Sequence, residues 1–334
     1  METLRINPLQ LQVSRIGLGT WAIGGVNWGG SDETDGIKTI LKAFELKINL
    51  IDTAPAYGFG NSETIVGKAI KLYGEREKIV IATKCGLEWE NSKKLIRNCS
   101  PKRIKKEVED SLKRLQTDYI DIYQIHWPDP LVPLAETAYA MLSLLQEGKI
   151  RAIGVSNFST AQMEEFMKVA PIHTSQPPYN LVERNIEKEI FPFTEKFNIP
   201  TLSYGSLCRG LLSGRMTAHT RFAGDDIRKY DPKFHEPNFS RYLAAVDALN
   251  KFSQHEYGQK VISLAIRWIL DHGRTVALWG ARQPTQLKGV KDILGWTLDA
   301  DAMKIIDNIL RLHVPHPIGS EFMAPSVRKH STPA

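Results

Sequence analysis

Four polar residues stand at or just beyond the ends of apolar, strand-like runs, and together they have the chemistry of a proton-transfer site. Asp52, Lys84 and His126 each close such a run, and Tyr57 lies five residues beyond Asp52 in the segment DTAPAYGFGNSE. A buried Asp and a buried Lys must pair, because a lone charge is costly to desolvate. The ammonium group would also stabilise a neighbouring phenolate and so lower the pKa of Tyr57 from about 10.

An acid beside a cation is what reduction of a carbonyl requires, since a hydride adds to carbon while a proton reaches oxygen. His126 could share that proton or orient the carbonyl. Each residue also has an ordinary structural explanation. Asp52 could cap a turn, and Lys84 could extend its ammonium from a barrel rim. Tyr57 could be an exposed loop aromatic, and His126 a buried core histidine. Their joint placement at strand ends favours a shared active site.

Eight short apolar runs recur along the chain and predict the buried strands that would position these residues. They cover residues 16–19, 49–52, 78–84, 119–126, 150–156, 173–176, 200–204 and 275–280. Segments with helical periodicity lie between them, at 34–46, 101–115, 134–147 and 160–169. Ser100 and Ser159 are expected N-caps, and Gly148 follows a helix end. Alternating strands and helices predict a parallel sheet, and eight repeats predict a closed (β/α)8 TIM barrel.

One long excursion interrupts this rhythm after the seventh strand. Residues 209–240 have loop composition, and one or two helices are expected at about 240–252 and 261–271. Loops of such length are commonly functional covers. No Pro- or Ser-rich linker divides the chain, so we expect a single domain over residues 1–334.

The carboxyl ends of barrel strands converge at one mouth, where active sites are built. Further polar residues fall at these ends: Ser156 with Asn157, Gln176, Tyr204, and Arg282 just past Gly280. The segment 280–284 precedes a helix, so its backbone N–H groups and the Arg282 guanidinium could form a phosphate site. The alternative is an ordinary turn with a surface arginine.

Residues 17–22 fit the G-x-G-x-x-A dinucleotide pattern, but more glycines follow and no helix is expected before about Asp32. We therefore interpret the segment as the first barrel strand, which turns into a loop with Trp21 at the mouth. The three cysteines are too few and scattered for a disulfide framework, and the histidines lack paired metal-ligand spacing. We expect buried, inert cysteines and no catalytic metal, although Cys85 beside Lys84 leaves redox control open.

Composition excludes several classes of protein. Apolar residues make up 42% and charged residues 24%, the balance of an ordinary soluble protein. The net charge of +6 is mild for 334 residues, so no nucleic-acid partner is expected. The N-terminus lacks the apolar run of a signal peptide, and no stretch reaches a membrane-spanning length. We expect a monomer in a reducing compartment, the cytoplasm.

Several segments together resemble the aldo-keto reductase superfamily over residues 16–306. They are Asp52-Thr53-Ala54 with Tyr57-Gly58 and Ser62-Glu63, Lys84 after Ile81-Ala82-Thr83, Asp118–Asp121 leading to His126, Gly148–Phe158, and Gly280-Ala281-Arg282 with Gln286-Leu287. Residues 126–130 and 204–210 look most like the bacterial general stress protein branch. The family's fold is the same barrel.

This resemblance implies a role for each matching residue. Tyr57 would be the general acid, Lys84 would lower its pKa, Asp52 would anchor Lys84, and His126 would orient the carbonyl. The cofactor would be NADPH. Thr20 and Trp21 would border the nicotinamide and the substrate, Ser156, Asn157 and Gln176 would hold the carboxamide, and Tyr204 would stack on the ring. The pyrophosphate would be bound by the backbone of Gly205, Ser206, Leu207, Cys208 and Arg209, with Arg215 and Arg228. Arg282 would bind the adenosine 2′-phosphate, and Gly280, Ala281 and Gln286 are further cofactor-binding residues of the same motif.

Two positions depart from the family pattern, and both belong to the adenosine end. Val290 stands where many members have an asparagine that contacts adenine, and Trp279 stands where proline is common. The implied activity is reduction of small aldehydes or ketones. The alternative is an NADPH-binding, redox-sensing partner protein with vestigial reductase activity, because potassium-channel β subunits resemble the same family.

Overall fold

The computed structural model describes residues 1–10, 12–89 and 93–328. The last six residues of the expected domain, as well as residues 11 and 90–92, lie outside this range. Eight parallel strands form a closed barrel in the order β10-β11-β12-β3-β4-β5-β8-β9. They are β3 (Ile16–Gly19), β4 (Leu50–Asp52), β5 (Val80–Cys85), β8 (Ile120–Ile125), β9 (Ile150–Ser156), β10 (Thr174–Gln176), β11 (Thr201–Ser203) and β12 (Thr275–Gly280). The predicted TIM barrel is confirmed, and each of its strands falls on a predicted apolar run.

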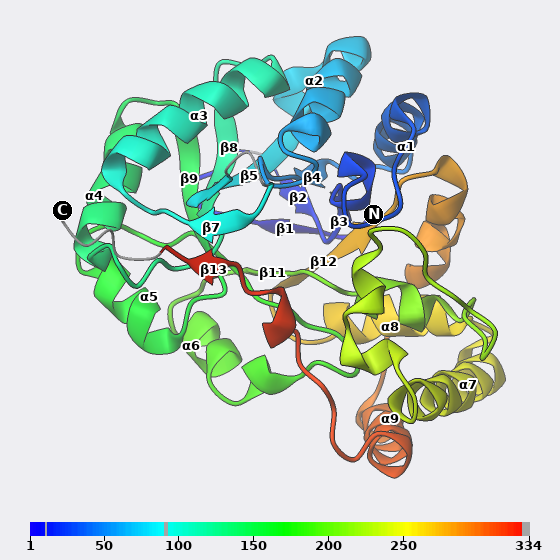
Figure 1. The fold of residues 1–334 in the computed structure, drawn as a ribbon. Helices are drawn as coiled ribbons and strands as arrows, with labels where there is room; N and C mark the ends of the chain where they lie inside the picture. The colour runs from blue at the N-terminus through cyan, green and yellow to red at the C-terminus, as the bar shows by residue number, and fades with distance from the viewer. Residues whose placement is uncertain (11, 90–92, 329–334) are drawn as a thin grey trace.

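Helices surround the barrel as a ring, which Figure 1 shows in a view along the strands. They are α1 (Glu33–Glu45), α2 (Asn61–Tyr73), α3 (Pro101–Leu115), α4 (Leu134–Gln146), α5 (Thr160–Met167), α6 (Ile190–Lys196) and α8 (Val261–Leu270), with α7 (Asn238–Tyr257) and α9 (Ala300–His313) outside the repeat. The expected caps are present: Ser100 accepts from Arg103 N, and Ser159 forms a capping box with Gln162. Helices α2, α6 and α9 were not predicted from the sequence.

The excursion after β11 holds three short 3-10 helices before α7 and α8. These are η4 (Cys208–Ser213), η5 (Ile227–Lys229) and η6 (Pro232–Phe234). Residues 209–240 are therefore more structured than their loop composition indicates, because buried ion pairs hold them, as described below. The two helices expected at the end of the excursion are confirmed.

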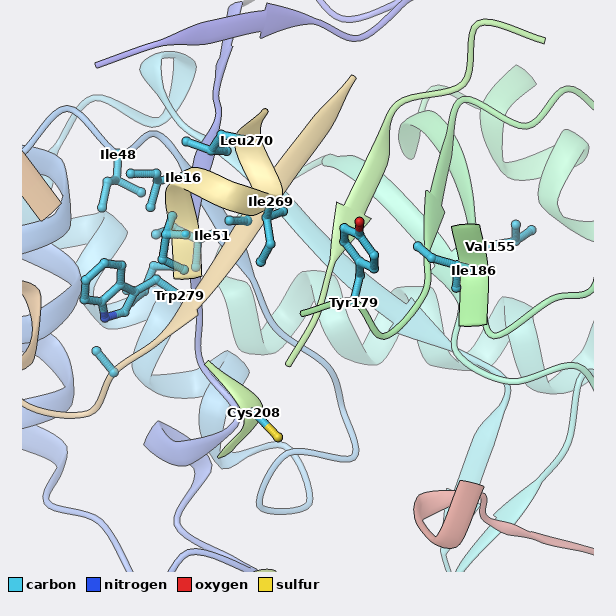
Figure 2. Packing of buried hydrophobic residues seen from close by; sticks show 14 of the residues in the cluster. Ile16, Ile48, Ile51, Val155, Tyr179, Ile186, Cys208, Ile269, Leu270 and Trp279 are labelled. Atoms are coloured by element: carbon cyan, nitrogen blue, oxygen red, sulfur yellow. The ribbon is translucent and has the colours of Figure 1, made fainter. Parts of the chain in front are cut away.

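Two hydrophobic clusters stabilise the barrel from inside and outside. A hairpin of β1 (Thr3–Arg5) and β2 (Gln12–Ser14) closes the end opposite the mouth and packs Leu4, Ile6, Leu9 and Val13 against the barrel interior. Each such burial contributes about 1.5–3 kcal/mol. The outer cluster fills the space between strands and helices, where Figure 2 shows Ile16, Ile51 and Trp279 close together.

The C-terminal segment returns from α9 across the barrel mouth, as the orange-to-red ribbon shows in Figure 1. Its last strand β13 (Ser326–Val327) pairs with β7 (Leu95–Arg97), which pairs with β6 (Leu87–Trp89). This small sheet therefore joins the loop after β5 to a segment more than 200 residues later. Within the described residues, no helix is both long and apolar enough to cross a membrane.

Candidate active site

Three of the predicted catalytic residues are joined by direct contacts at the mouth. Lys84, at the end of β5, places Nζ 2.7 Å from Asp52 Oδ1 and 2.9 Å from the Thr53 carbonyl oxygen. The same Nζ lies 3.3 Å from the Tyr57 hydroxyl. Lys84 and Asp52 are almost fully buried, so their charges compensate one another at low dielectric. The structure therefore presents a phenol to a fixed ammonium group.

The loop that carries Tyr57 is held by backbone contacts and by a chain of buried hydroxyls. Ser62 N donates to the Tyr57 carbonyl, and Ser62 Oγ lies 2.8 Å from Thr20 Oγ1 and 2.9 Å from Thr53 Oγ1. Thr20 Oγ1 in turn donates to the Asp52 carbonyl. A Cβ on Gly24 would stand 2.6 Å from the Tyr57 carbonyl carbon, so only glycine allows this close packing. Tyr57 is thus fixed against the ends of β3 and β4.

The pKa of Tyr57 is raised well above its ordinary value by burial and by the Asp52 carboxylate. The sequence-based expectation was a pKa lowered by Lys84. In the free protein, burial outweighs the contact with the ammonium, whose own charge is balanced by Asp52. Tyr57 therefore stays protonated at neutral pH, as a proton donor must.

His126 lies beside Tyr57, with ring centroids 5.9 Å apart and nearly perpendicular planes. Burial and the nearby Lys84 lower its pKa well below the ordinary value. The imidazole is therefore neutral at pH 7. Of the two roles considered for His126, this state favours orienting a carbonyl by a hydrogen bond over storing a proton.

The residues expected at the carboxamide lie together at the ends of β9 and β10. Asn157 adopts a positive φ of 60°. Its Nδ2 donates to the His126 carbonyl oxygen, and its Oδ1 accepts a hydrogen bond from the Tyr204 hydroxyl. Ser156 Oγ donates to the Gln176 carbonyl at 2.7 Å. Gln176 Nε2 donates to Asp52 Oδ2 at 2.7 Å, so its amide also positions the Asp52 carboxylate.

Two cavities meet at Tyr57 and Tyr204. The larger, of about 260 Å³, runs along the ends of β3, β11 and β12. Predicted residues in its wall are Thr20, Trp21, Tyr204, Gly205, Ser206, Leu207, Arg209, Arg228, Gly280, Ala281, Arg282 and Gln286. The smaller, of about 90 Å³, is lined by His126, Ser156, Asn157 and Gln176, with Trp127, Leu87 and Leu95. The two cavities share Trp21, Tyr57, Tyr204 and Met323 in their walls, so they are adjacent.

The Cys208 side chain is buried in the outer hydrophobic cluster, and Figure 2 shows it apart from the other labelled side chains. All three cysteines are buried and free, and burial raises the pKa of Cys85, Cys99 and Cys208. Cys208 does not line the larger cavity, and its N–H donates to the Gly205 carbonyl oxygen, so the structure does not bring this predicted residue to the cavity wall.

The predicted arginines differ in how far their charge is already balanced. Arg209 is buried between Glu183 and Asp231, and Arg228 pairs with Asp226. Arg282 Nη1 donates hydrogen bonds to the carbonyl oxygens of Trp28 and Gly30. Its Nε and Nη2 make no hydrogen bond to the described part of the chain. Arg215 is exposed and lines a neighbouring cavity of about 380 Å³ with Arg221. Among these four arginines, Arg282 and Arg215 are therefore the two whose guanidinium groups have no carboxylate partner in the described part of the chain.

One donor beside the larger cavity is unpaired. Trp28 lines this cavity, and its buried Nε1 has no hydrogen-bond partner among the described residues. The Trp28 ring meets that of Trp21 edge to face, with centroids 5.4 Å apart. No group of three or more His, Cys, Asp or Glu residues suited to a metal occurs in the described ranges.

The sequence did not identify Trp28, Gln124 or Met323 as site residues. Gln124 Nε2 lies 3.3 Å from Asp52 Oδ2, and Met323 lines both cavities. A polar residue inside a buried strand is a signal that could have identified Gln124. Met323 had no such signal, because its position depends on the path of the C-terminal segment.

Glu107 on α3 supports the strand end that carries Lys84, since its Oε2 accepts from Gly86 N at 2.8 Å. Burial raises the pKa of Glu107 to about 7. The folded state therefore binds this proton more tightly than the unfolded state, and stability is lost as pH rises from about 4.5 to about 7.

We expect Glu107→Gln to remove this loss, because a neutral amide does not ionise. Thermal unfolding measured from pH 5 to pH 8 should show the parent losing stability relative to the variant. Exposed Glu164 offers a matched control, Glu164→Gln, whose curve should follow the parent. Parallel curves for Glu107→Gln and the parent would show that Glu107 is not protonated in the fold.

The closed barrel carries a buried Asp–Lys pair, a phenol and an imidazole at its mouth, an arrangement suited to proton transfer. The model of the "Aldo/keto reductase family" matches residues 15–311. The chain belongs to the aldo-keto reductase family and is an oxidoreductase of that family. The family predicted from the sequence is confirmed.

Two curated relatives cover nearly the whole chain. "Aldo-keto reductase YhdN" of Bacillus subtilis (strain 168) is 57% identical over 330 residues, which are 98% of this chain and 99% of that protein. "NADH-specific methylglyoxal reductase" of Escherichia coli (strain K12) is 38% identical and covers 90% of this chain and 96% of that protein. The Bacillus relative supports the predicted bacterial branch.

Solved structures agree with the barrel. A glycerol dehydrogenase, AKR11B4, from Gluconobacter oxydans has a TM-score of 0.88 at 53% identity, with 96% of this chain and 99% of that chain covered. An aldo/keto reductase from Klebsiella pneumoniae in complex with NADP and acetate has a TM-score of 0.71 at 27% identity, with 95% of this chain and 97% of that chain covered.

Proposed function

We propose that the protein catalyses the NADPH-dependent reduction of a small aldehyde or ketone, with Tyr57 as the general acid. The observation that carries this proposal is the Tyr57 hydroxyl 3.3 Å from the Lys84 ammonium, which Asp52 holds at 2.7 Å. The proposal includes a monomer in the cytoplasm, on the grounds of composition and of three free, buried cysteines.

The residues present fit the cofactor. NADPH, when bound, supplies a hydride to the carbonyl carbon. The larger cavity would hold most of it. The carboxamide would reach Ser156, Asn157 and Gln176 in the wall of the smaller cavity, with Tyr204, which lines both cavities, against the ring. The Gly205–Arg209 backbone, Arg215 and Arg228 would face the pyrophosphate, and Arg282, beside Gly280, Ala281 and Gln286, would face the 2′-phosphate.

The side chains of the smaller cavity would then perform the proton transfer. Neutral His126 donates a hydrogen bond that orients the carbonyl oxygen toward Tyr57. The Tyr57 hydroxyl gives its proton to that oxygen, and Lys84 stabilises the phenolate that forms. Trp21, stacked 5.9 Å from the Tyr57 ring, and Trp127 exclude water from the reacting atoms. The volume of about 90 Å³ favours a small carbonyl.

The test is a panel of aldehydes and ketones assayed with NADPH and NADH in parallel, followed by absorbance at 340 nm. We expect multiple turnovers with small aldehydes. Tight NADPH binding with turnover close to zero for every carbonyl would instead support the redox-sensing alternative, and light scattering would then show whether a stable oligomer accompanies it.

Arg282 should decide the preference for NADPH, because its Nε and Nη2 remain free of hydrogen bonds to the described residues. We expect Arg282→Leu to raise the KM for NADPH about tenfold, a loss of about 1.4 kcal/mol, and to leave that for NADH within about twofold. Exposed Arg241→Leu on α7 is the matched control. Equal efficiency of the parent with both cofactors would contradict this role.

A further inference from the structure

The long excursion contains a fully buried lysine. Lys233, in η6, places Nζ 2.9 Å from Glu183 Oε1 and 3.4 Å from Asp231 Oδ1. The same Nζ donates to the carbonyl oxygens of Ile318 at 2.9 Å and Gly319 at 2.7 Å. Burying an ammonium costs several kcal/mol unless partners compensate it, so these contacts define where the residue acts. Two of the four partners belong to the C-terminal segment.

Lys233 belongs to a charge-balanced cluster of two cations and two carboxylates. Arg209 Nε lies 2.6 Å from Asp231 Oδ2, and Arg209 Nη2 lies 2.9 Å from Glu183 Oε1. Asn180 Nδ2 donates to Glu183 Oε2 at 2.6 Å and to the Gly205 carbonyl at 3.0 Å. The cluster therefore connects the loops after β10 and β11 with η6 and the C-terminal segment.

Residues 318–325, which we term the C-terminal strap, extend from this cluster to the substrate cavity. The Phe322 ring lies 5.3 Å from Arg209 Cζ and 5.9 Å from Lys233 Nζ. Met323 lines both cavities and Pro325 lines the smaller one. The strap thus forms part of the wall that a carbonyl substrate would touch.

The two ends of the strap are held differently. At its downstream end, Arg97 Nε donates to the Pro325 carbonyl, and β13 pairs with β7 immediately after. At its upstream end, Ile318 N donates to the Tyr242 hydroxyl, and Lys233 binds two successive carbonyls. Lys233 is the charged anchor of the upstream end and is itself held rigidly by Glu183 and Asp231.

We propose that Lys233 is a positioning residue that fixes the C-terminal strap as a wall of the carbonyl pocket. It acts on the substrate through Met323 and Pro325 rather than by contact. The proposal rests on the proposed function, because it assigns the smaller cavity to a carbonyl substrate.

Lys233→Met tests this directly, since it keeps most of the side-chain volume and removes the ammonium. We expect the KM for a small aldehyde to rise about tenfold, with kcat within about threefold and the Kd for NADPH within about twofold of the parent, the pattern of lost ground-state binding. Amide hydrogen exchange of residues 318–325 should accelerate in the same variant. Lys229→Met, an exposed lysine of the same excursion, is the matched control and should match the parent in both measurements.

A folded Lys233→Met variant with unchanged KM and unchanged exchange would overturn the proposal. So would a loss of NADPH affinity as large as the change in KM, because Lys233 would then act through the cofactor cavity. If Lys233→Met does not fold, Phe322→Ala replaces it, since that ring is half-buried on the cluster. The same rise in KM and in exchange is expected, and their absence overturns the proposal.

Failure of the proposed function has a different signature. A parent protein that reduces no carbonyl with either cofactor would refute the function. The exchange of residues 318–325 in Lys233→Met would still report whether Lys233 anchors the strap.

Discussion

Tyr57→Phe should lower kcat for carbonyl reduction by about 10²–10⁴-fold, the range expected for loss of a positioned general acid. The change removes one oxygen atom and leaves the ring stacked on Trp21 and edge to face with His126. Because the pKa of Tyr57 is raised, the hydroxyl keeps its proton at neutral pH and can donate it. NADPH oxidation at 340 nm measures the effect.

Binding and folding should survive this substitution. NADPH affinity, measured by quenching of tryptophan fluorescence, should stay within about threefold, since Phe retains the contact area. Tyr139→Phe on the exposed face of α4 is the matched control and should have parental activity. A Tyr57→Phe variant that turns over as fast as the parent would exclude Tyr57 as the proton donor.

Lys84→Met should impair both activity and stability. Asp52 would remain buried with its charge uncompensated, which typically costs about 3–5 kcal/mol. Activity should fall by about 10²-fold or more, because the phenolate formed at Tyr57 would lose its cation. Chemical denaturation and steady-state kinetics on one preparation measure the two effects.

A double variant separates the loss of stability from the loss of activity. Lys84→Met with Asp52→Asn leaves no unpaired buried charge, so much of the lost stability should return. Activity should not return, because the ammonium is still missing. Recovery of both together would mean that Lys84 acts only through the fold.

The barrel was predictable because its strands are buried on both faces and appear as apolar runs. The run at 150–156 coincides with β9, and that at 275–280 with β12. Helix α2 was missed because its N-cap is Gly60 in a left-handed conformation, without a capping side chain.

The proximity of Asp52, Tyr57, Lys84 and His126 was predictable for a related reason, because the carboxyl ends of barrel strands converge at one mouth. The direction of the shift in the Tyr57 pKa was not predictable from the sequence, because the shift depends on burial and no local sequence pattern shows how deeply the side chain is buried. The balanced charge of Arg209 was likewise hidden, since Glu183 and Asp231 are distant in the chain and become partners only in the fold. Residue type alone does not tell a free cation from a neutralised one.

The pairing of β12 with β3 closes the barrel between residues about 260 positions apart. Arginine side chains stabilise this strand pair at both ends. Arg15 Nε donates to the Thr275 carbonyl oxygen at the end opposite the mouth, and Arg282 Nη1 donates to the carbonyl oxygens of Trp28 and Gly30 at the mouth. During synthesis on the ribosome, the nascent sheet must therefore keep two unpaired edges until residue 280 has emerged. Such edges are templates for aggregation, and contacts this distant form slowly. In the cell, the yield of this enzyme should accordingly depend on chaperone capacity and translation rate more than on the stability of the finished barrel.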